Sequence, residues 1–300
     1  MTTLPVTVVI PAYNRADMLP RAIASVRAQR PLRPAEIVVV DDGSTDNTTA
    51  VASRQGARVV GHEENRGAAA ARNTGVEAAG QPWIALLDSD DEWLPHHLAT
   101  LWDHRDGRVI AGGAAVRLGE LPGDVRYSGA TSDGPLELRS PAQIAFPENP
   151  LPASGVLVRR DAVVGAGGFD PSLRYAEDFD LWMRVLEQGA GVALPVVVYR
   201  WNGHAGSKSG HRHGPRDAHR RIIQSYAGRP WWSPELMERR TTVAEWDDLR
   251  QALSERDRRA AARSAGWILA RPRRTAALLR LLRHRRRIRR LTRELVRDGA

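Results

Sequence analysis

The chain has 300 residues with 44 basic and 35 acidic side chains, which give a net charge of +9, and it contains no cysteine. This length provides for one large domain or one domain with an extension, and 42% hydrophobic and 26% charged residues are typical of a globular chain rather than a disordered one. The absence of cysteine excludes disulfide scaffolds, thiolate zinc sites, iron–sulfur clusters and cysteine nucleophiles.

Strand-like and helix-like segments alternate over the first half of the chain. Runs of apolar, mostly β-branched residues predict buried strands, and apolar residues at helical spacing predict helices between them. The strands are expected at 6–10, 36–40, 57–60 and 83–87, and the helices at 17–29, 45–54 and 67–79. This order predicts an α/β fold with a mostly parallel sheet and helices on both faces.

Polar or aromatic side chains follow three of these strands. They are Pro11-Ala12-Tyr13-Asn14, Asp41-Asp42 and Asp88-Ser89-Asp90. Because ligands bind at the carboxyl ends of the strands in such sheets, we expect these groups to form one site.

Asp88 and Asp90 are separated by one residue, so both carboxylates can face one divalent ion. Oxygen ligands of this kind favour Mg²⁺ or Mn²⁺. The competing interpretation is a solvated acidic turn, since Asp and Ser are good helix caps. Asp42 at a second strand end favours the metal site.

The second half of the chain is less regular. The Gly, Pro, Ser and Asp content of residues 112–152 predicts loops with at most one edge strand. Strands are expected at 155–159 and 195–201, and an acidic motif at 175–180 is expected to open a helix. A polar loop at 203–214 includes His204, Ser207, Lys208 and Ser209, and the pattern is helical from Pro215 onward.

Several common catalytic motifs are missing from the sequence. Neither G-x-G-x-x-G nor G-x-x-x-x-G-K-[ST] occurs, so a nucleotide would be held by a metal and side chains rather than by a glycine-rich loop. The sequence also lacks H-E-x-x-H and G-x-S-x-G, which removes the main support for a metalloprotease or an α/β-hydrolase.

Six motifs over about residues 5–205 occur in the order typical of inverting family 2 glycosyltransferases, which the chain therefore resembles. They are VVIPAYNR (8–15), VVDDGSTDNT (39–48), NRGAAAARN (65–73), LLDSDDEW (86–93), GGFD (167–170) and AEDFDLWMR (176–184). The resemblance implies a GT-A fold, with a nucleotide-sugar-binding half at 1–110 and an acceptor-binding half at 111–205. Residues 206–300 would then form a mobile loop and a helical, basic C-terminal extension.

The activity that the resemblance implies is inverting transfer from a nucleotide sugar, usually a UDP-sugar, to a hydroxyl group. The acceptor would be a glycan, a lipid-linked sugar or a secondary metabolite, and the reaction would depend on Mn²⁺ or Mg²⁺. The residues that match the family's donor-binding positions are Pro11, Ala12, Tyr13, Arg15, Asp42, Arg72, Asp88 and Ser89.

The resemblance also implies individual roles for these residues. Tyr13 would stack on the nucleobase, Asp42 would accept an N–H of the base, and Asp88 would contact the ribose side. Asp90, together with Asp88, would hold the metal that bridges to the diphosphate. Arg72 is either near the nucleotide or a salt-bridged helix residue. His204 either completes the metal shell or is an exposed loop histidine.

Asp178 matches the family's general base, which removes the proton of the acceptor hydroxyl. We expect the neighbouring Glu177 to raise the pKa of Asp178 if both groups are partly desolvated. The competing interpretation is an acidic helix N-terminus that the helix dipole favours.

The positive charge of the chain is concentrated at its C-terminal end. Residues 271–300 carry twelve arginines and two acidic residues, a net charge of +10, so the first 270 residues carry −1. A helix at 275–296 would be amphipathic, with Leu281, Ile288 and Leu295 seven residues apart. It would either lie in an anionic membrane surface or pack on the body of the protein.

The hydropathy of the chain and its first residues indicate where in the cell the protein is expected. No apolar run approaches the ~20 residues that cross a bilayer, and the start, MTTLPVTVVIPAYN, has no basic segment of a signal peptide. We therefore expect a cytoplasmic protein, with peripheral attachment to the inner face of the cell membrane as the alternative that the basic tail adds.

Two other functions are weighed against glycosyl transfer. Nucleic-acid binding has the arginines in its favour, but no aromatic residue lies among them from 271 onward. A nucleotidylyltransferase acting on a sugar phosphate uses a related scaffold but normally has a Gly-rich N-terminal loop with a basic residue, which LPVTVVIPAYNRAD lacks.

Overall fold

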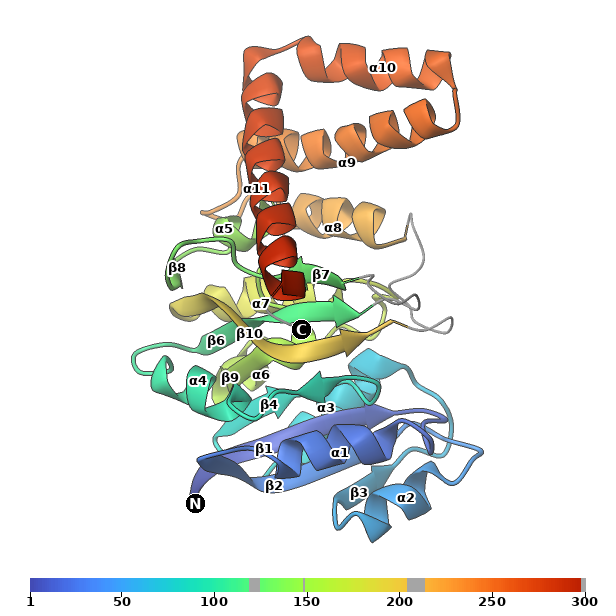
Figure 1. Ribbon diagram of the computed structural model, residues 1–300, viewed down its shortest axis with the longest axis vertical. Helices are drawn as coiled ribbons and strands as arrows, with labels where there is room; N and C mark the ends of the chain where they lie inside the picture. The colour runs from blue at the N-terminus through green and yellow to red at the C-terminus, as the bar shows by residue number, and fades with distance from the viewer. Residues whose placement is uncertain (119–124, 148, 204–213, 298–300) are drawn as a thin grey trace.

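The computed structural model describes residues 1–118, 125–147, 149–203 and 214–297. A central sheet has the strand order β3-β2-β1-β4-β9-β6-β10-β5, with β7 paired to β6 and β8 to β10 (Figure 1). The strands are β1 (Thr2–Ala12), β2 (Leu32–Asp41), β3 (Arg58–Gly61), β4 (Trp83–Leu86), β5 (Glu92–Trp93), β6 (Ile110–Leu118), β7 (Val125–Ser128), β8 (Leu136–Leu138), β9 (Val156–Arg159) and β10 (Gly191–Asn202).

Helices flank the sheet and extend beyond it. They are α1 (Leu19–Arg27), α2 (Thr48–Arg54), α3 (Ala68–Ala78), α4 (His97–Asp103), α5 (Ala142–Ala145), η1 (Ala153–Gly155), α6 (Arg160–Gly165), α7 (Glu177–Leu186), α8 (Gly214–Ser225), α9 (Pro234–Ser254), α10 (Arg258–Leu269) and α11 (Pro272–Arg297). The predicted α/β class and the helical C-terminal extension are confirmed.

The first half of the sheet is parallel, as the sequence predicts. Strand β1 pairs in parallel with β2 and β4, and β2 pairs in parallel with β3. Alternate residues of β1 enter two separate cores: Val8 packs with α1 and α4, whereas Val9 packs with α3 and α6. Burial on both faces explains why this strand is a continuous apolar run.

The second half of the sheet is mixed. Strand β9 is antiparallel to both β4 and β6, while β10 is parallel to β6 and antiparallel to β5. The first part of the stretch in which loops were expected, residues 112–118, belongs to β6, a nine-residue strand in the middle of the sheet. Its glycines permit close packing: a Cβ on Gly112 would lie 2.4 Å from Leu151, and one on Gly113 would lie 2.5 Å from Val198.

Helices α8 to α11 stand beyond the sheet, and α11 runs back from them toward β7 (Figure 1). Its side chains Ala277 and Leu281 are buried, and Thr292 Oγ1 accepts a hydrogen bond from the Tyr127 N–H (3.0 Å). Of the two alternatives for 275–296, the structure therefore shows packing of the apolar stripe on the body. In the part of the chain described, no helix combines the length and apolarity needed to span a membrane.

Candidate active site

A pocket of about 790 Å³ lies at the carboxyl ends of β1, β2 and β4. The site residues predicted from the sequence that line it are Pro11, Ala12, Tyr13, Arg15, Asp42, Arg72, Asp88, Ser89, Asp90 and Asp178. His204, like Ser207, Lys208 and Ser209, lies outside the described residues. The structure thus brings together residues that are up to 167 positions apart in the sequence.

The loops after β1 and β2 are joined to each other by hydrogen bonds. The Asn14 N–H donates to Ser44 Oγ (2.9 Å), and Asn14 Oδ1 accepts from the Thr45 N–H (2.8 Å). Asn14 has a positive φ of 52°, which Asn tolerates better than most residues. This arrangement leaves Tyr13 43% exposed at the pocket, with ring surface accessible to a ligand.

Asp42 is buried at the pocket wall and holds the loop that precedes α3. One carboxylate oxygen lies 2.6 Å from His62 Nδ1 and accepts from the Arg66 N–H (2.9 Å), and the other accepts from the Gly67 N–H (2.8 Å). An ionised carboxylate offers about four acceptor positions, so these three contacts leave capacity for a ligand N–H. His62, which sequence reasoning missed, positions this carboxylate.

The acidic loop after β4 is held by Ser154 of η1. Ser154 Oγ accepts from the Asp88 N–H (3.0 Å) and donates to Asp91 Oδ2 (2.7 Å). Asp91 is buried, and burial followed by the charges of Asp88 and Asp90 raises its pKa well above the usual range. Asn202 of β10 adds a bond from its Nδ2 to the Asp90 carbonyl (3.0 Å).

The donor set of this loop fits a hard divalent cation. Asp88 and Asp90 both line the pocket, and Mg²⁺ in proteins is commonly bound by one or two carboxylates together with substrate phosphates. Within the ranges that the structure describes, no group of three or more His, Asp or Glu side chains is arranged as a metal site.

Arg72 of α3 is buried between two carboxylates. Its Nη2 donates to Asp88 Oδ1 (2.6 Å), and its Nη1 donates to Glu177 Oε1 (2.8 Å). Burial alone lowers the pKa of the guanidinium, but the charges of Asp88 and Glu177 raise it above its usual range. Arg72 is thus the ion-paired helix residue of the second interpretation, and it also lines the pocket.

Asp178 lies in the first turn of α7, next to Glu177, the second carboxylate partner of Arg72. Burial and then the Glu177 charge raise the pKa of Asp178 to about 7, although Arg72 and the Phe179 N–H (2.8 Å) oppose the shift. A raised pKa of Asp178 is the direction of shift expected from the sequence. The residue before the helix, Ala176, adopts a left-handed conformation (φ 62°), which is unfavourable for alanine and fixes how the chain enters the helix.

Asp180 has a structural role two residues further along α7. Its Oδ2 pairs with Arg184, and its Oδ1 accepts from the Tyr226 hydroxyl (2.7 Å), which follows α8. Arg184 in turn donates to the Gly168 carbonyl (2.7 Å) in the loop before α7. These contacts hold the start of α7, and therefore Asp178, against the C-terminal helices.

Two solved structures that hold nucleotide sugars have a similar fold. S. aureus TarS in complex with UDP-GlcNAc superimposes with a TM-score of 0.61, at 19% identity, covering 100% of this chain and 92% of that chain. The mannosyltransferase PcManGT of Pyrobaculum calidifontis, in complex with GDP-Man and Mn²⁺, gives a TM-score of 0.56 at 23% identity, covering 91% and 83%. The fold is thus the GT-A type that the sequence predicts.

The family model of glycosyl transferase family 2 matches residues 7–161, and the chain belongs to this family. Among its relatives, the succinoglycan biosynthesis protein ExoU of Rhizobium meliloti is 33% identical over 228 residues, which are 67% of this chain and 64% of that protein. The pre-mycofactocin glycosyltransferase of Mycobacterium tuberculosis is 34% identical over 203 residues, 64% of this chain and 41% of that protein. The chain therefore matches less than two thirds of the length of these relatives.

Family membership bears on the three functional classes that the sequence leaves open. The relatives support the glycosyltransferase class, and neither the nucleotidylyltransferase nor the nucleic-acid-binding alternative receives support from them.

Proposed function

We propose that the protein transfers a sugar, with inversion, from a UDP-sugar to a hydroxyl group, with Mn²⁺ or Mg²⁺ bound at Asp88 and Asp90. The observation that carries the proposal is that an acidic loop and a carboxyl group with a pKa of about 7 line one pocket of about 790 Å³. The complexes of TarS with UDP-GlcNAc and of PcManGT with GDP-Man support a nucleotide sugar as donor.

The donor would occupy the side of the pocket formed by β1, β2 and β4. The exposed ring of Tyr13 offers a face for stacking on the nucleobase, and Asp42 offers an oxygen for one of its N–H groups. Ala12, Pro11 and Arg15 complete this wall. A divalent cation at Asp88 and Asp90 would supply charge stabilisation to the diphosphate leaving group.

The acceptor would approach from the side of α7. The ionised carboxylate of Asp178 accepts the proton of the acceptor hydroxyl. At the same time, the oxygen of that hydroxyl forms a bond to the anomeric carbon. The bond between that carbon and the diphosphate oxygen breaks on the opposite face, and the nucleoside diphosphate leaves with the electron pair. Because the pKa of Asp178 is about 7, an appreciable fraction of this carboxyl group is ionised at neutral pH. The ionised form is also a stronger base than a carboxylate of ordinary pKa.

The acceptor class is a further part of the proposal. We infer a hydroxyl of a glycan, a lipid-linked sugar or a secondary metabolite, and succinoglycan in the name of the R. meliloti relatives supports a polysaccharide. We also infer a cytoplasmic location for this reaction, because the proposed donor, a nucleotide sugar, is available in the cytoplasm.

Thermal melting in the presence of nucleotides tests the proposed donor. UDP together with Mn²⁺ is expected to raise the melting temperature more than UDP alone, because the cation links the protein carboxylates to the diphosphate. UTP with a sugar 1-phosphate serves as the control for nucleotidylyl transfer. If no nucleoside diphosphate changes the melting temperature with or without Mn²⁺, the proposal is wrong.

A further inference from the structure

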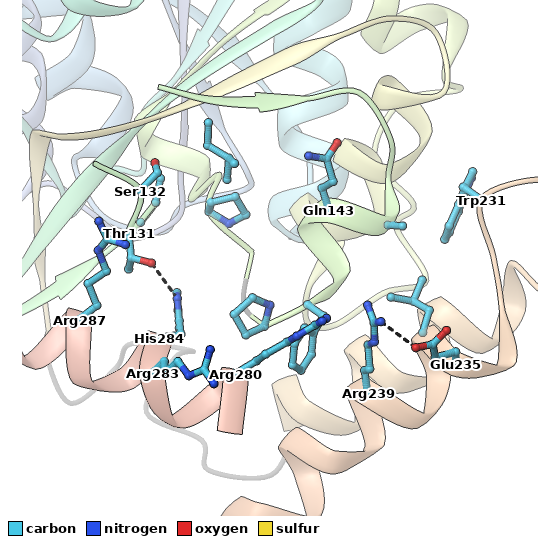
Figure 2. A pocket seen from close by; sticks show the side chains of 18 of the residues that line it. Thr131, Ser132, Gln143, Trp231, Glu235, Arg239, Arg280, Arg283, His284 and Arg287 are labelled. Carbon is cyan, nitrogen blue, oxygen red and sulfur yellow. Dashed lines mark hydrogen bonds and ion pairs between the residues drawn. The ribbon is translucent and has the colours of Figure 1, made fainter. Parts of the chain in front are cut away.

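A second pocket of about 680 Å³ lies where α11 meets α9, α5 and the segment 129–136 (Figure 2). No residue lines both this pocket and the candidate active site. Pro150 lines the second pocket, and Pro152, two residues later, lines the first. We call the second pocket the arginine pocket.

The lining of the arginine pocket is strongly basic. It contains Arg239 from α9 and Arg280, Arg283 and Arg287 from α11, against a single carboxylate, Glu235. Figure 2 shows Arg280 and Arg283 extending from α11 on the side of the pocket opposite Gln143. An excess of positive charge in a concave site raises the local concentration of anions.

Most polar groups around the arginine pocket already have partners within the protein. Arg239 pairs with Glu235 (2.7 Å), Arg287 pairs with Asp133, and His284 bonds to Thr131 (3.0 Å).

The amide of Gln143 is likewise used: it accepts from the Arg139 N–H (2.7 Å) and donates to the Glu137 carbonyl (2.9 Å). These contacts therefore fix the position of the groups that shape the pocket.

Arg280 and Arg283 differ from these groups in their surroundings. Both are exposed, and no carboxylate in the described part of the chain lies within 4.0 Å of either guanidinium. They are three positions apart on α11, so they project from the same helix face, where like charges repel. An anion between them would remove this repulsion. The planar guanidinium presents paired donors that match the oxygens of a phosphate group.

Part of the lining of the arginine pocket is apolar. Its walls include Leu136, Phe146, Trp231 and Leu236, together with Pro147 and Pro150. A small inorganic anion would use the arginines but leave this surface uncovered. A ligand with a charged group attached to an apolar body would cover both parts of the site.

We propose that the arginine pocket binds an amphiphilic phosphate ester. The phosphate would lie on Arg280 and Arg283, and the apolar part would lie along the wall that contains Phe146 and Trp231. The site is separate from the catalytic pocket, and the proposal does not depend on the proposed sugar transfer. Its chemistry is that of a lipid phosphate headgroup held individually in a pocket, not of a membrane attracted by the whole charge of α11.

Two probes with the same phosphate monoester headgroup test the proposal on the full-length protein. Dihexanoyl phosphatidic acid, below its micelle concentration, carries two short acyl chains, and glycerol 3-phosphate carries none. Calorimetric titration is expected to show saturable binding of the lipid, about tenfold or more tighter than binding of glycerol 3-phosphate, because the chains bury apolar surface.

A matched pair of double variants separates the pocket from the general charge of the helix. Arg280→Gln with Arg283→Gln removes the two pocket cations and is expected to weaken lipid binding about tenfold or more. Arg286→Gln with Arg293→Gln removes the same charge from exposed positions of α11 outside the pocket and is expected to change binding less than about twofold. Melting curves check that all forms are folded.

Three results would overturn the proposal. One is the absence of lipid binding to the unaltered protein at millimolar concentration. A second is equal affinity for the lipid and for glycerol 3-phosphate, which would show that the apolar wall contacts no ligand. The third is an equal loss of binding in the two double variants, which would assign the effect to the overall charge of α11.

Discussion

The guanidinium of Arg72 donates a hydrogen bond of 2.8 Å to the carboxylate of Glu177, a residue 105 positions later in the sequence. Because Arg72 also holds Asp88, this one side chain connects the acidic loop after β4 with the first turn of α7. The proposed metal ligands and the proposed base therefore keep a fixed spacing. In addition, the positive charge of Arg72 opposes the rise in the pKa of Asp178 that burial and Glu177 cause.

Replacement of this arginine tests its positioning role. Arg72→Gln leaves Asp88 and Glu177 without their buried partner, and the loss of such an ion pair costs about 3–5 kcal/mol of the free energy of unfolding. Because Arg72 holds down the pKa of Asp178, the rise of the transfer rate with pH is expected to move to higher pH in the variant.

The pH shift distinguishes positioning from a merely structural role. Arg54→Gln, which alters an exposed arginine at the end of α2, is the control and should change neither stability nor pH profile. An unchanged pH profile in folded Arg72→Gln would contradict the coupling to Asp178.

The proposed metal site predicts a specific effect of Asp90→Ala. UDP binding in the presence of Mn²⁺ should weaken strongly, whereas UDP binding without metal should change little, because only the first depends on the bridging carboxylate. Calorimetry with and without Mn²⁺ measures both. Asp106→Ala, at an exposed position remote in sequence from the loop, is the matched control. If Mn²⁺ strengthens UDP binding to Asp90→Ala as much as to the unaltered protein, the acidic loop is only a capped turn.

The sequence predicts the parallel half of the fold and most of the pocket for a clear physical reason. Strands buried on both faces, such as β1, leave continuous apolar runs, and polar residues that directly follow them must lie at one edge of the sheet. The sequence alone therefore predicts that Asp42, Asp88 and Asp90 lie in one site, and all three line the same pocket.

Strand β6 could not be predicted because its glycines have the composition of a loop. In the structure Gly112 and Gly113 provide the space that Leu151 and Val198 occupy, and these neighbours are distant in sequence. Composition alone does not distinguish a glycine that turns the chain from one that permits close packing.

The residues that support the site were missed for a related reason. Ser154 fixes the acidic loop across 63 positions of the chain, and His62 bonds to Asp42 across 20. Neither lies in a motif whose spacing carries information. The periodicity of α11 likewise shows that the helix is amphipathic but not which surface covers its apolar stripe.

Packing of α11 on the body predicts unequal effects of two neighbouring leucines. Leu281 is fully buried whereas Leu279 is 50% exposed. Leu281→Ala should lower the free energy of unfolding by about 2–4 kcal/mol, and Leu279→Ala by less than about 0.5 kcal/mol. Denaturant titration of the two variants measures the difference. Equal small effects would mean that α11 is not held on the protein in solution and would revive the interfacial-helix alternative.

Buried His97 predicts a loss of stability in acid. Its ring stacks on Trp93 (3.9 Å between centroids), and burial lowers its pKa to about 3 from an ordinary value of 6.5. The folded protein therefore excludes a proton that the unfolded chain binds below pH 6.5, so stability falls as the pH falls. The slope for this group is about 1.4 kcal/mol per pH unit between 6.5 and 3.

Unfolding free energies of the unaltered protein and of His97→Phe, measured over this pH range, isolate the contribution of His97. The Phe variant keeps an aromatic ring but cannot be protonated, so its pH dependence should be shallower. His96→Phe, at the exposed neighbouring position, is expected to keep the original slope. Parallel curves for the unaltered protein and His97→Phe would show that His97 does not exclude the proton.

The transfer rate of Asp178→Asn tests the central claim most directly. An amide cannot accept the proton of the acceptor hydroxyl, so kcat should fall by a factor of order 10² or more while UDP binding stays near that of the unaltered protein. The unaltered enzyme should show a rate that rises with pH to a plateau above about 7, as Asp178 ionises. Asp170→Asn, an exposed carboxylate before the same helix, is the control. Transfer by Asp178→Asn at more than about half the original rate would contradict the assignment of Asp178 as the base.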